Sequence, residues 1–107
     1  MADTTANKLL LNHSGNGGSI GLDVDGFVTA AFQVFGVFTG TVEFEASLDG
    51  AQFSQIICED IKNGSSHTFT KSAGIFRCNV RAIKQVRVVI TNYVSGSISV
   101  TASAIQA

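Results

Sequence analysis

The chain has 107 residues, of which 45% are hydrophobic and 14% charged, and its net charge is −1. The apolar share excludes an intrinsically disordered protein, and the length is that of one ordinary domain. An isoelectric point near 6.0 argues against a nucleic-acid-binding protein, and no apolar run approaches the ~20 residues of a membrane-spanning helix. Because about a quarter of the residues of a soluble protein are usually charged, we expect copies of the chain or a partner to cover part of this surface.

Residues 1–8 are small and polar and predict a flexible arm, followed by one β domain over 9–107. Turn signals about 8–12 residues apart predict an all-β fold, a single antiparallel β-sandwich or jelly-roll-like domain of about eight or nine strands. The glycine-rich segment 14–18 is expected to be a flexible loop. The expected strands cover residues 9–11, 20–24, 27–36, 41–48, 53–58, 67–70, 74–80, 86–93 and 98–105.

One pattern occurs twice, 56 positions apart: Phe38–Ala46 aligns with Val94–Ala102. Each copy has a hydroxyl residue, a glycine and a second hydroxyl residue, followed by strict apolar/polar alternation. Such a pattern predicts a tight turn at Gly40 and at Gly96, each leading into a half-buried strand, because glycine readily adopts positive φ.

Charge is distributed unevenly along the chain. Residues 1–60 contain one lysine and all eight acidic residues, a balance of −7, whereas residues 61–107 carry six basic residues and no acid. Sequential strands usually neighbour each other, so we favour pairing of these charges across strands within one fold. A bipolar surface that joins neighbouring copies or binds a charged partner is the alternative. The candidate interface residues are Asp3, Lys8, Glu43, Glu45, Arg77, Arg81, Lys84 and Arg87.

No catalytic or metal-binding pattern is complete. Glu43 and Glu45 lie two apart on one predicted strand, but no aromatic sugar platform accompanies them, so a glycosidase is rejected. Residues 23–26 resemble only a fragment of a calcium loop. His13 and His67 lie in polar loops without cysteine partners at zinc spacing. We therefore expect a protein that is not an enzyme and uses no cofactor or metal.

The two cysteines are expected to be buried thiols. Cys78 alternates with Phe76 and Val80 on one face of a predicted strand, and the opposite face carries polar residues. The acidic start of the sequence lacks the apolar core of a secretory signal, so we expect synthesis in a reducing cytosol. A disulfide between Cys58 and Cys78 stays open as an alternative if their strands are adjacent.

Four segments carry a resemblance to a known group of proteins: 39–53 (a Thr-Gly-Thr-Val strand and a Ser-x-Asp-Gly turn), 73–77, 84–88 and 95–101. With them the chain resembles small β-sandwich proteins encoded among the virion genes of tailed bacteriophages. This resemblance implies a head decoration or tail accessory component without a cofactor. Phe53 stands where such proteins frequently have tryptophan, which argues against sugar binding by that loop.

The first functional hypothesis is therefore a structural virion protein, assembled in the host cytoplasm, that decorates or cements a capsid. Its expected partners are itself and a major capsid or tail protein, with no nucleic acid and no membrane insertion. The chain has no proline to guard its edge strands, which agrees with strand addition from another subunit. The alternative is a tail or fibre adsorption module that binds a host-surface glycan. A non-viral adhesion or carbohydrate-binding sandwich ranks last because it needs a secretory route.

Overall fold

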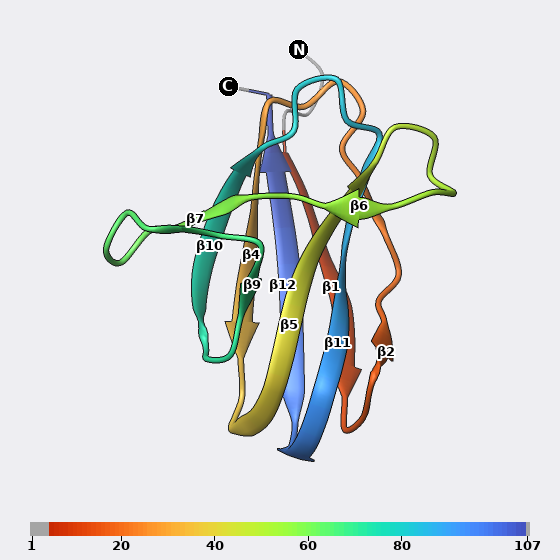
Figure 1. The fold of residues 1–107 in the computed structure, drawn as a ribbon. Helices are drawn as coiled ribbons and strands as arrows, with labels where there is room; N and C mark the ends of the chain where they lie inside the picture. Colours follow the sequence, from red (N-terminus) through yellow and green to blue (C-terminus); the bar gives the residue numbers. More distant parts are fainter. Residues whose placement is uncertain (1–4, 107) are drawn as a thin grey trace.

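The computed structural model describes residues 5–106, with side chains described from residue 9 onward. These residues form an all-β structure of two antiparallel sheets, each with six strands (Figure 1). No helix in this range is long and apolar enough to cross a membrane. The strands are β1 (Thr5–His13), β2 (Gly17–Gly18), β3 (Leu22–Asp23), β4 (Thr29–Phe35), β5 (Phe38–Ser47), β6 (Ser54–Gln55), β7 (Cys58–Asp60), β8 (Ser66–His67), β9 (Phe69–Thr70), β10 (Gly74–Asn79), β11 (Gln85–Gly96) and β12 (Ile98–Ile105).

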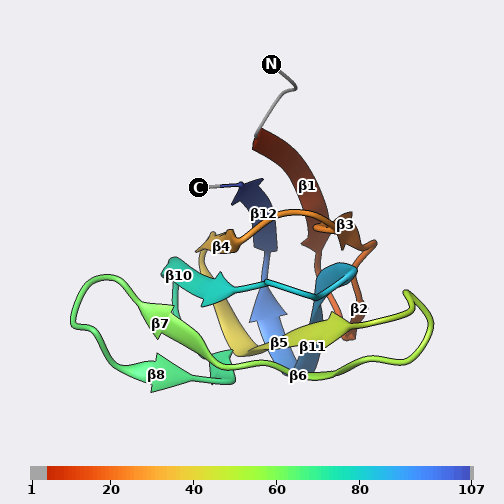
Figure 2. The same cartoon turned by 90° about the horizontal axis from the view of Figure 1, so that it is seen from above.

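The two sheets have different strand orders and enclose one core. The first sheet has the order β1-β12-β4-β10-β7-β8, and the second has β2-β11-β5-β6, with β3 added to β11 and β9 added to β5. Viewed along the strands, the long strands of the two sheets form two layers (Figure 2). The arrangement is sandwich-like, and its long antiparallel strands are as predicted.

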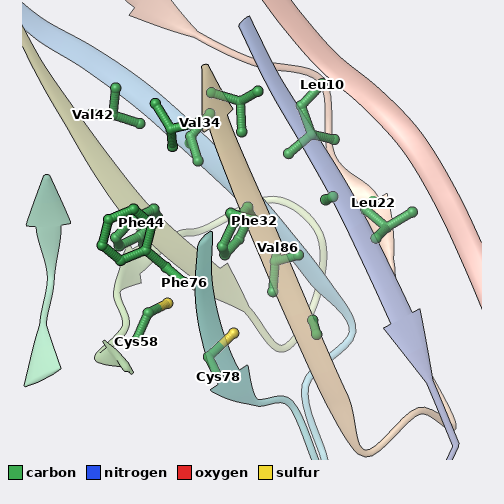
Figure 3. Packing of buried hydrophobic residues seen from close by; sticks show 14 of the residues in the cluster. Leu10, Leu22, Phe32, Val34, Val42, Phe44, Cys58, Phe76, Cys78 and Val86 are labelled. Atoms are coloured by element: carbon green, nitrogen blue, oxygen red, sulfur yellow. The ribbon is translucent and has the colours of Figure 1, made fainter. Parts of the chain in front are cut away.

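Aromatic rings join the two layers. Phe32 of β4 stacks on Phe44 of β5 with ring centroids 5.1 Å apart, and Phe44 also contacts Phe76 of β10 at 5.1 Å. All three rings are almost completely buried, and valine, isoleucine and leucine side chains from both sheets surround them (Figure 3). Because each strand turns alternate residues inward, this single contact region buries one face of each sheet.

The central strands form one ladder that continues from sheet to sheet. In the first sheet β4 pairs with β12, from Thr29 opposite Ile105 to Phe35 opposite Ser99. In the second sheet β5 pairs with β11, beginning with Phe38 opposite Gly96. The β4–β5 segment is therefore antiparallel to the β11–β12 segment along its whole length, and both segments bend between the sheets at the same end of the molecule.

Each bend contains a glycine that fits against the other bend. Gly36 has φ +118° and Gly96 has φ +94°, in the left-handed region that glycine favours. A Cβ at Gly36 would collide with the carbonyl oxygen of Ser97, and a Cβ at Gly96 would collide with that of Val37. The N–H of Ser97 donates to the carbonyl of Val37 at 3.0 Å, which fixes the two bends against each other. We refer to this pair of bends, residues 35–38 and 95–98, as the glycine corner.

The predicted repeat is thus confirmed in its burial pattern and corrected in one of its turns. Gly96 is the last residue of β11 and has the predicted positive φ at the bend before β12, but Gly40 lies inside β5, and the bend before that strand is at Gly36. Gly40 is needed for a different reason. A Cβ there would lie 3.3 Å from the Cα of Tyr93, so the absence of a side chain lets β11 approach β5 closely.

Several predicted boundaries also differ from the structure. Strand β1 begins at Thr5, so the boundary predicted at residue 9 falls inside a strand that pairs with β12; residues 1–4 lie outside the described range. Residues 17–18, expected in a flexible loop, pair with β11. The predicted strand 53–58 is divided between β6 and β7, which belong to different sheets. These short edge pairings arise from backbone contacts with long neighbours, so they leave no apolar periodicity in the sequence.

The glycine corner gives a direct test of the fold. Gly96→Ala should destabilise the protein by about 3 kcal/mol, from about 1 kcal/mol of left-handed strain and about 2 kcal/mol of steric overlap. Gly64→Ala is the matched control, since Gly64 has φ +76° but a Cβ at this position would meet no atom within 4 Å. This variant should lose only about 1 kcal/mol of the free energy of unfolding. The measurement is urea unfolding followed by circular dichroism. Equal losses in the two variants would contradict the role given to the corner.

Candidate functional site

Acidic and basic residues pair across neighbouring strands on the outer faces of both sheets. In the second sheet Arg87 lies opposite Glu45, and its Nε donates to the Glu45 Oε1 at 2.8 Å. In the first sheet Arg77 lies opposite Glu59, and its Nη2 donates to the Glu59 Oε1 at 2.8 Å. At these two places strand pairing brings an acidic residue of the first half of the sequence beside a basic residue of the second half. Such pairing within one fold is the interpretation favoured from the sequence.

The two arginine pairs differ in their surroundings. The Arg87 guanidinium lies 3.9 Å above the ring of Phe53, and the side chains of the Arg87–Glu45 pair are 33% and 17% exposed. The Arg77–Glu59 side chains are 55% and 44% exposed. Lower exposure weakens solvent screening, and the stacked ring adds a cation–π contact, so the Arg87 pair contributes more to stability.

The remaining candidate interface residues are dispersed. Arg81 and Lys84 are exposed on the turn between β10 and β11, and no side-chain bond from either is seen to residues 9–106. Glu43 accepts hydrogen bonds on both carboxylate oxygens, from Gln55 at 2.6 Å and from Thr91 at 2.8 Å. Asp3 and the side chain of Lys8 lie outside the described part of the chain. Of the predicted interface residues, Glu45, Arg77 and Arg87 therefore take part in cross-strand ion pairs, Glu43 bonds to neutral side chains, and Arg81 and Lys84 stay exposed.

A polar groove runs along the outer face of the second sheet, where β9 adds to β5. Its volume is about 370 Å³, and an adjoining hollow of about 340 Å³ shares three of its lining residues. Phe69 is 43% exposed and supplies an aromatic surface in this otherwise polar site. We call it the β5–β9 groove; its lining residues are Thr41, Glu43, Gln55, Thr68, Phe69, Lys71 and Asn92.

A β-bulge shapes one end of this groove. The register between β11 and β5 shifts between Thr91 and Ser95, and Asn92 within this shift has φ +52°. Bulges turn side chains out of the regular ladder, and positive φ at a residue other than glycine is uncommon. The bulge places Asn92 beside Lys71 and Thr41, an arrangement that sequence reasoning missed because the segment reads as a continuous strand.

A second hollow, of about 530 Å³, lies beside the turn that follows β5. Ser47 and Asp49 build this turn: the Asp49 carboxylate accepts from the N–H groups of Ala51 at 2.8 Å and Gln52 at 2.9 Å, and from the Ser47 hydroxyl. These hydrogen bonds lower the pKa of Asp49 to about 2. One carboxylate oxygen, Oδ1, accepts all three of these hydrogen bonds, so the turn at the rim of the hollow is well ordered. The sequence predicted the turn but not the hollow.

The described strands leave one long sheet edge. The other outer strands, β8 in the first sheet and β2, β3, β6 and β9 in the second, are two residues long. In contrast, β1 has nine residues and is the last strand of its sheet, with a register shift between Leu9 and Leu11. An edge strand exposes N–H and C=O groups that can pair with another chain.

The described side chains include a serine–histidine contact but no metal-binding cluster. Residues 5–106 contain no cluster of three or more His, Cys, Asp or Glu side chains. The hydroxyl of Ser65 lies 2.8 Å from Nε2 of His67, but the same hydroxyl donates to Asn63 at 2.6 Å. Asn63 and Ser65 belong to the turn between β7 and β8, and His67 is the last residue of β8, so these hydrogen bonds order the end of the loop.

The fold is similar to that of two solved proteins. The SPBc2 prophage-derived protein YomS matches with a TM-score of 0.83 and 8% identity, over 94% of this chain and 92% of that one. The PBSX exported protein XepA matches with a TM-score of 0.81 and 21% identity, over 94% of this chain but only 37% of that longer one. No family model and no curated protein matches the sequence. At these identities the likeness establishes the fold.

The two arginine pairs can be compared by one conservative change. Arg87→Lys should lower the free energy of unfolding by about 1 kcal/mol, because an ammonium loses the planar stacking on Phe53. Arg77→Lys keeps an exposed ion pair and should change stability by less than about 0.5 kcal/mol. Urea unfolding of both variants measures the difference. If the two variants lose the same free energy of unfolding, burial and stacking do not make the Arg87 pair the stronger one.

Proposed function

We propose that this chain is a structural component of a phage particle, a module that decorates or cements the head through protein–protein contacts. The observation that carries the proposal is the likeness in fold to a prophage-derived protein over nearly the whole of both chains. The resemblance of segments 39–53 and 95–101 to virion proteins supports it independently. The proposed location is the virion, assembled in the host cytoplasm, and the proposed role needs neither catalysis nor a cofactor.

The β1 edge is the surface that we propose for assembly. It offers a row of backbone groups nine residues long, and Leu9 on this strand has a 54% exposed side chain. Strand addition needs few charged contacts, since main-chain hydrogen bonds supply the affinity, and this agrees with the 14% charged fraction. The proposed occupant is a second copy of the chain or a capsid or tail protein strand.

Substitution on the edge tests this role. Leu9→Lys should weaken self-association or shell binding at least about tenfold, equivalent to ~1.4 kcal/mol, because an edge lysine opposes strand addition. Ile61→Lys is the control: Ile61 is 48% exposed and follows β7 on the opposite side of the same sheet. Sedimentation equilibrium and co-sedimentation with phage heads measure the two interactions.

Two outcomes would oppose the proposal. If the wild-type protein is strictly monomeric and leaves phage heads bare in electron micrographs, it is not a decoration module. If Leu9→Lys and Ile61→Lys behave alike while wild-type protein binds, the protein acts in the particle through a surface other than β1. If electron micrographs show the protein on the tail instead of the head, the protein is a tail component.

The β5–β9 groove favours a second candidate function, adsorption to a host-surface glycan. Saccharide sites combine an aromatic surface with several hydrogen-bonding side chains, and this groove offers Phe69 together with Lys71, Asn92 and Thr41. Both Glu43 oxygens are already bonded to neighbours, which holds the floor of the groove in one arrangement.

A matched pair of phenylalanines tests the groove. If the groove binds a glycan, Phe69→Ala should reduce binding of the wild-type hit on a bacterial glycan array by roughly tenfold, or ~1.4 kcal/mol. Phe35→Ala is the control, because Phe35 is also 43% exposed but lies at the end of β4, where it is the first residue of the glycine corner and does not line the groove. A wild-type protein that binds no glycan on the array, or equal losses in both variants, would reject adsorption through this groove.

A further inference from the structure

The two cysteines of this chain lie opposite each other on neighbouring strands. Strand β7 pairs with β10 through Asp60 opposite Phe76 and Glu59 opposite Arg77. One further step of this register places Cys58 opposite Cys78. Both are reduced thiols, with exposed fractions of 0% and 5%. Figure 3 shows both sulfur atoms directed into the core below the Phe44 and Phe76 rings.

This placement suits a cross-strand disulfide. Residues directly opposite each other in an antiparallel pair have Cβ atoms about 4.5–5.5 Å apart, and a disulfide needs about 3.5–4.5 Å, so a small approach of β7 and rotation of both χ1 angles is sufficient. We propose that Cys58 and Cys78 are an oxidation site that closes to an intramolecular disulfide when the protein meets an oxidising environment.

The chemistry requires an external oxidant, for which a small-molecule disulfide such as oxidised glutathione is adequate. One cysteine thiolate attacks the oxidant, forming a mixed disulfide and releasing one small thiol. The second cysteine thiolate then attacks the protein-bound sulfur and releases the second small thiol. Overall the two cysteines lose two protons and two electrons, and one molecule of oxidant is reduced to two thiols.

Formation of the disulfide in the folded protein requires part of the structure to open. The hydrogen bond that the Cys58 thiol makes to Cys78, together with burial, raises the pKa of this thiol above its ordinary value, so the reactive thiolate is scarce while the core is closed. Among the described strands, only the two-residue β8 pairs with the outer side of β7. Opening of this edge exposes Cys58 without unfolding the central ladder, so oxidation should be slow and limited by that opening.

The disulfide would fasten the least regular part of the molecule. Between β5 and β10 the chain leaves the second sheet after β6, adds β7 and β8 to the first sheet, and returns to the second with β9. Each of these strands has two or three residues. A bond from Cys58 to Cys78 would attach this excursion covalently to β10 and constrain the unfolded chain between them.

The inference does not rest on the proposed function, but the two agree. A phage particle is assembled in a reducing cytoplasm and afterwards persists outside the cell, where structural disulfides are stable. Assembly would then use the reduced, locally openable form, and the released particle would hold the oxidised form.

The experiment compares the reduced and oxidised protein. After incubation with oxidised glutathione, the wild-type protein should lose both titratable thiols, decrease in mass by about 2 Da and remain a monomeric chain on a non-reducing gel. Its melting temperature should rise by on the order of 10 °C and return when the bond is reduced. Cys58→Ala is the control and should show neither the mass change nor the thermal shift.

A second experiment distinguishes thiols that are too buried to meet the oxidant from thiols that cannot reach each other. The protein is also refolded from urea with oxidised glutathione present, so that access does not limit the reaction. If both thiols stay titratable in this arm, or are recovered only as glutathione adducts or intermolecular dimers, the proposal is overturned. A disulfide that forms but lowers the melting temperature would overturn the stabilising role.

Discussion

The β4–β5 and β11–β12 segments bend from one sheet to the other at the same place, and each bend is possible only because it contains a glycine. At the glycine corner each α-carbon lies against a carbonyl of the other bend, so the two turns interlock where no side chain fits. With the corner in place, one antiparallel ladder supplies the central strands of both sheets. The shared aromatic core then lies inside the folded ladder, and every shorter strand adds to its sides.

The same ladder decides the electrostatics of the surface. It brings β5 from the acidic half of the sequence beside β11 from the basic half, and Glu45 thus meets Arg87. At this pair, and at the Arg77–Glu59 pair of the first sheet, charges from the two halves of the sequence are interleaved on the outer faces. The polar groove shaped by a bulge and the long backbone edge are features of shape and hydrogen bonding, not of net charge.

Sequence patterns predicted the parts of the fold whose residues alternate between core and solvent. The strand predicted at 98–105 agrees with β12, and Phe76, Cys78 and Val80 are buried as their alternation indicated. Patterns could not predict that Gly40 serves close packing instead of a turn, because both uses need the same missing side chain. Nor could they predict the groove: Phe69, Lys71 and Asn92 are brought together by a two-residue strand and a bulge, which leave no periodic signal.

The position of β12 in the first sheet has a consequence for how the protein is made. This strand lies between β1 and β4, yet it is the last of the described strands to leave the ribosome. Until it emerges, β1 has no neighbour among the described strands and β4 lacks one of its two, so the first sheet stays incomplete and only its β4-β10-β7-β8 part can pair. The first sheet is therefore completed by contacts between residues far apart in the sequence, and such contacts form slowly compared with local pairing.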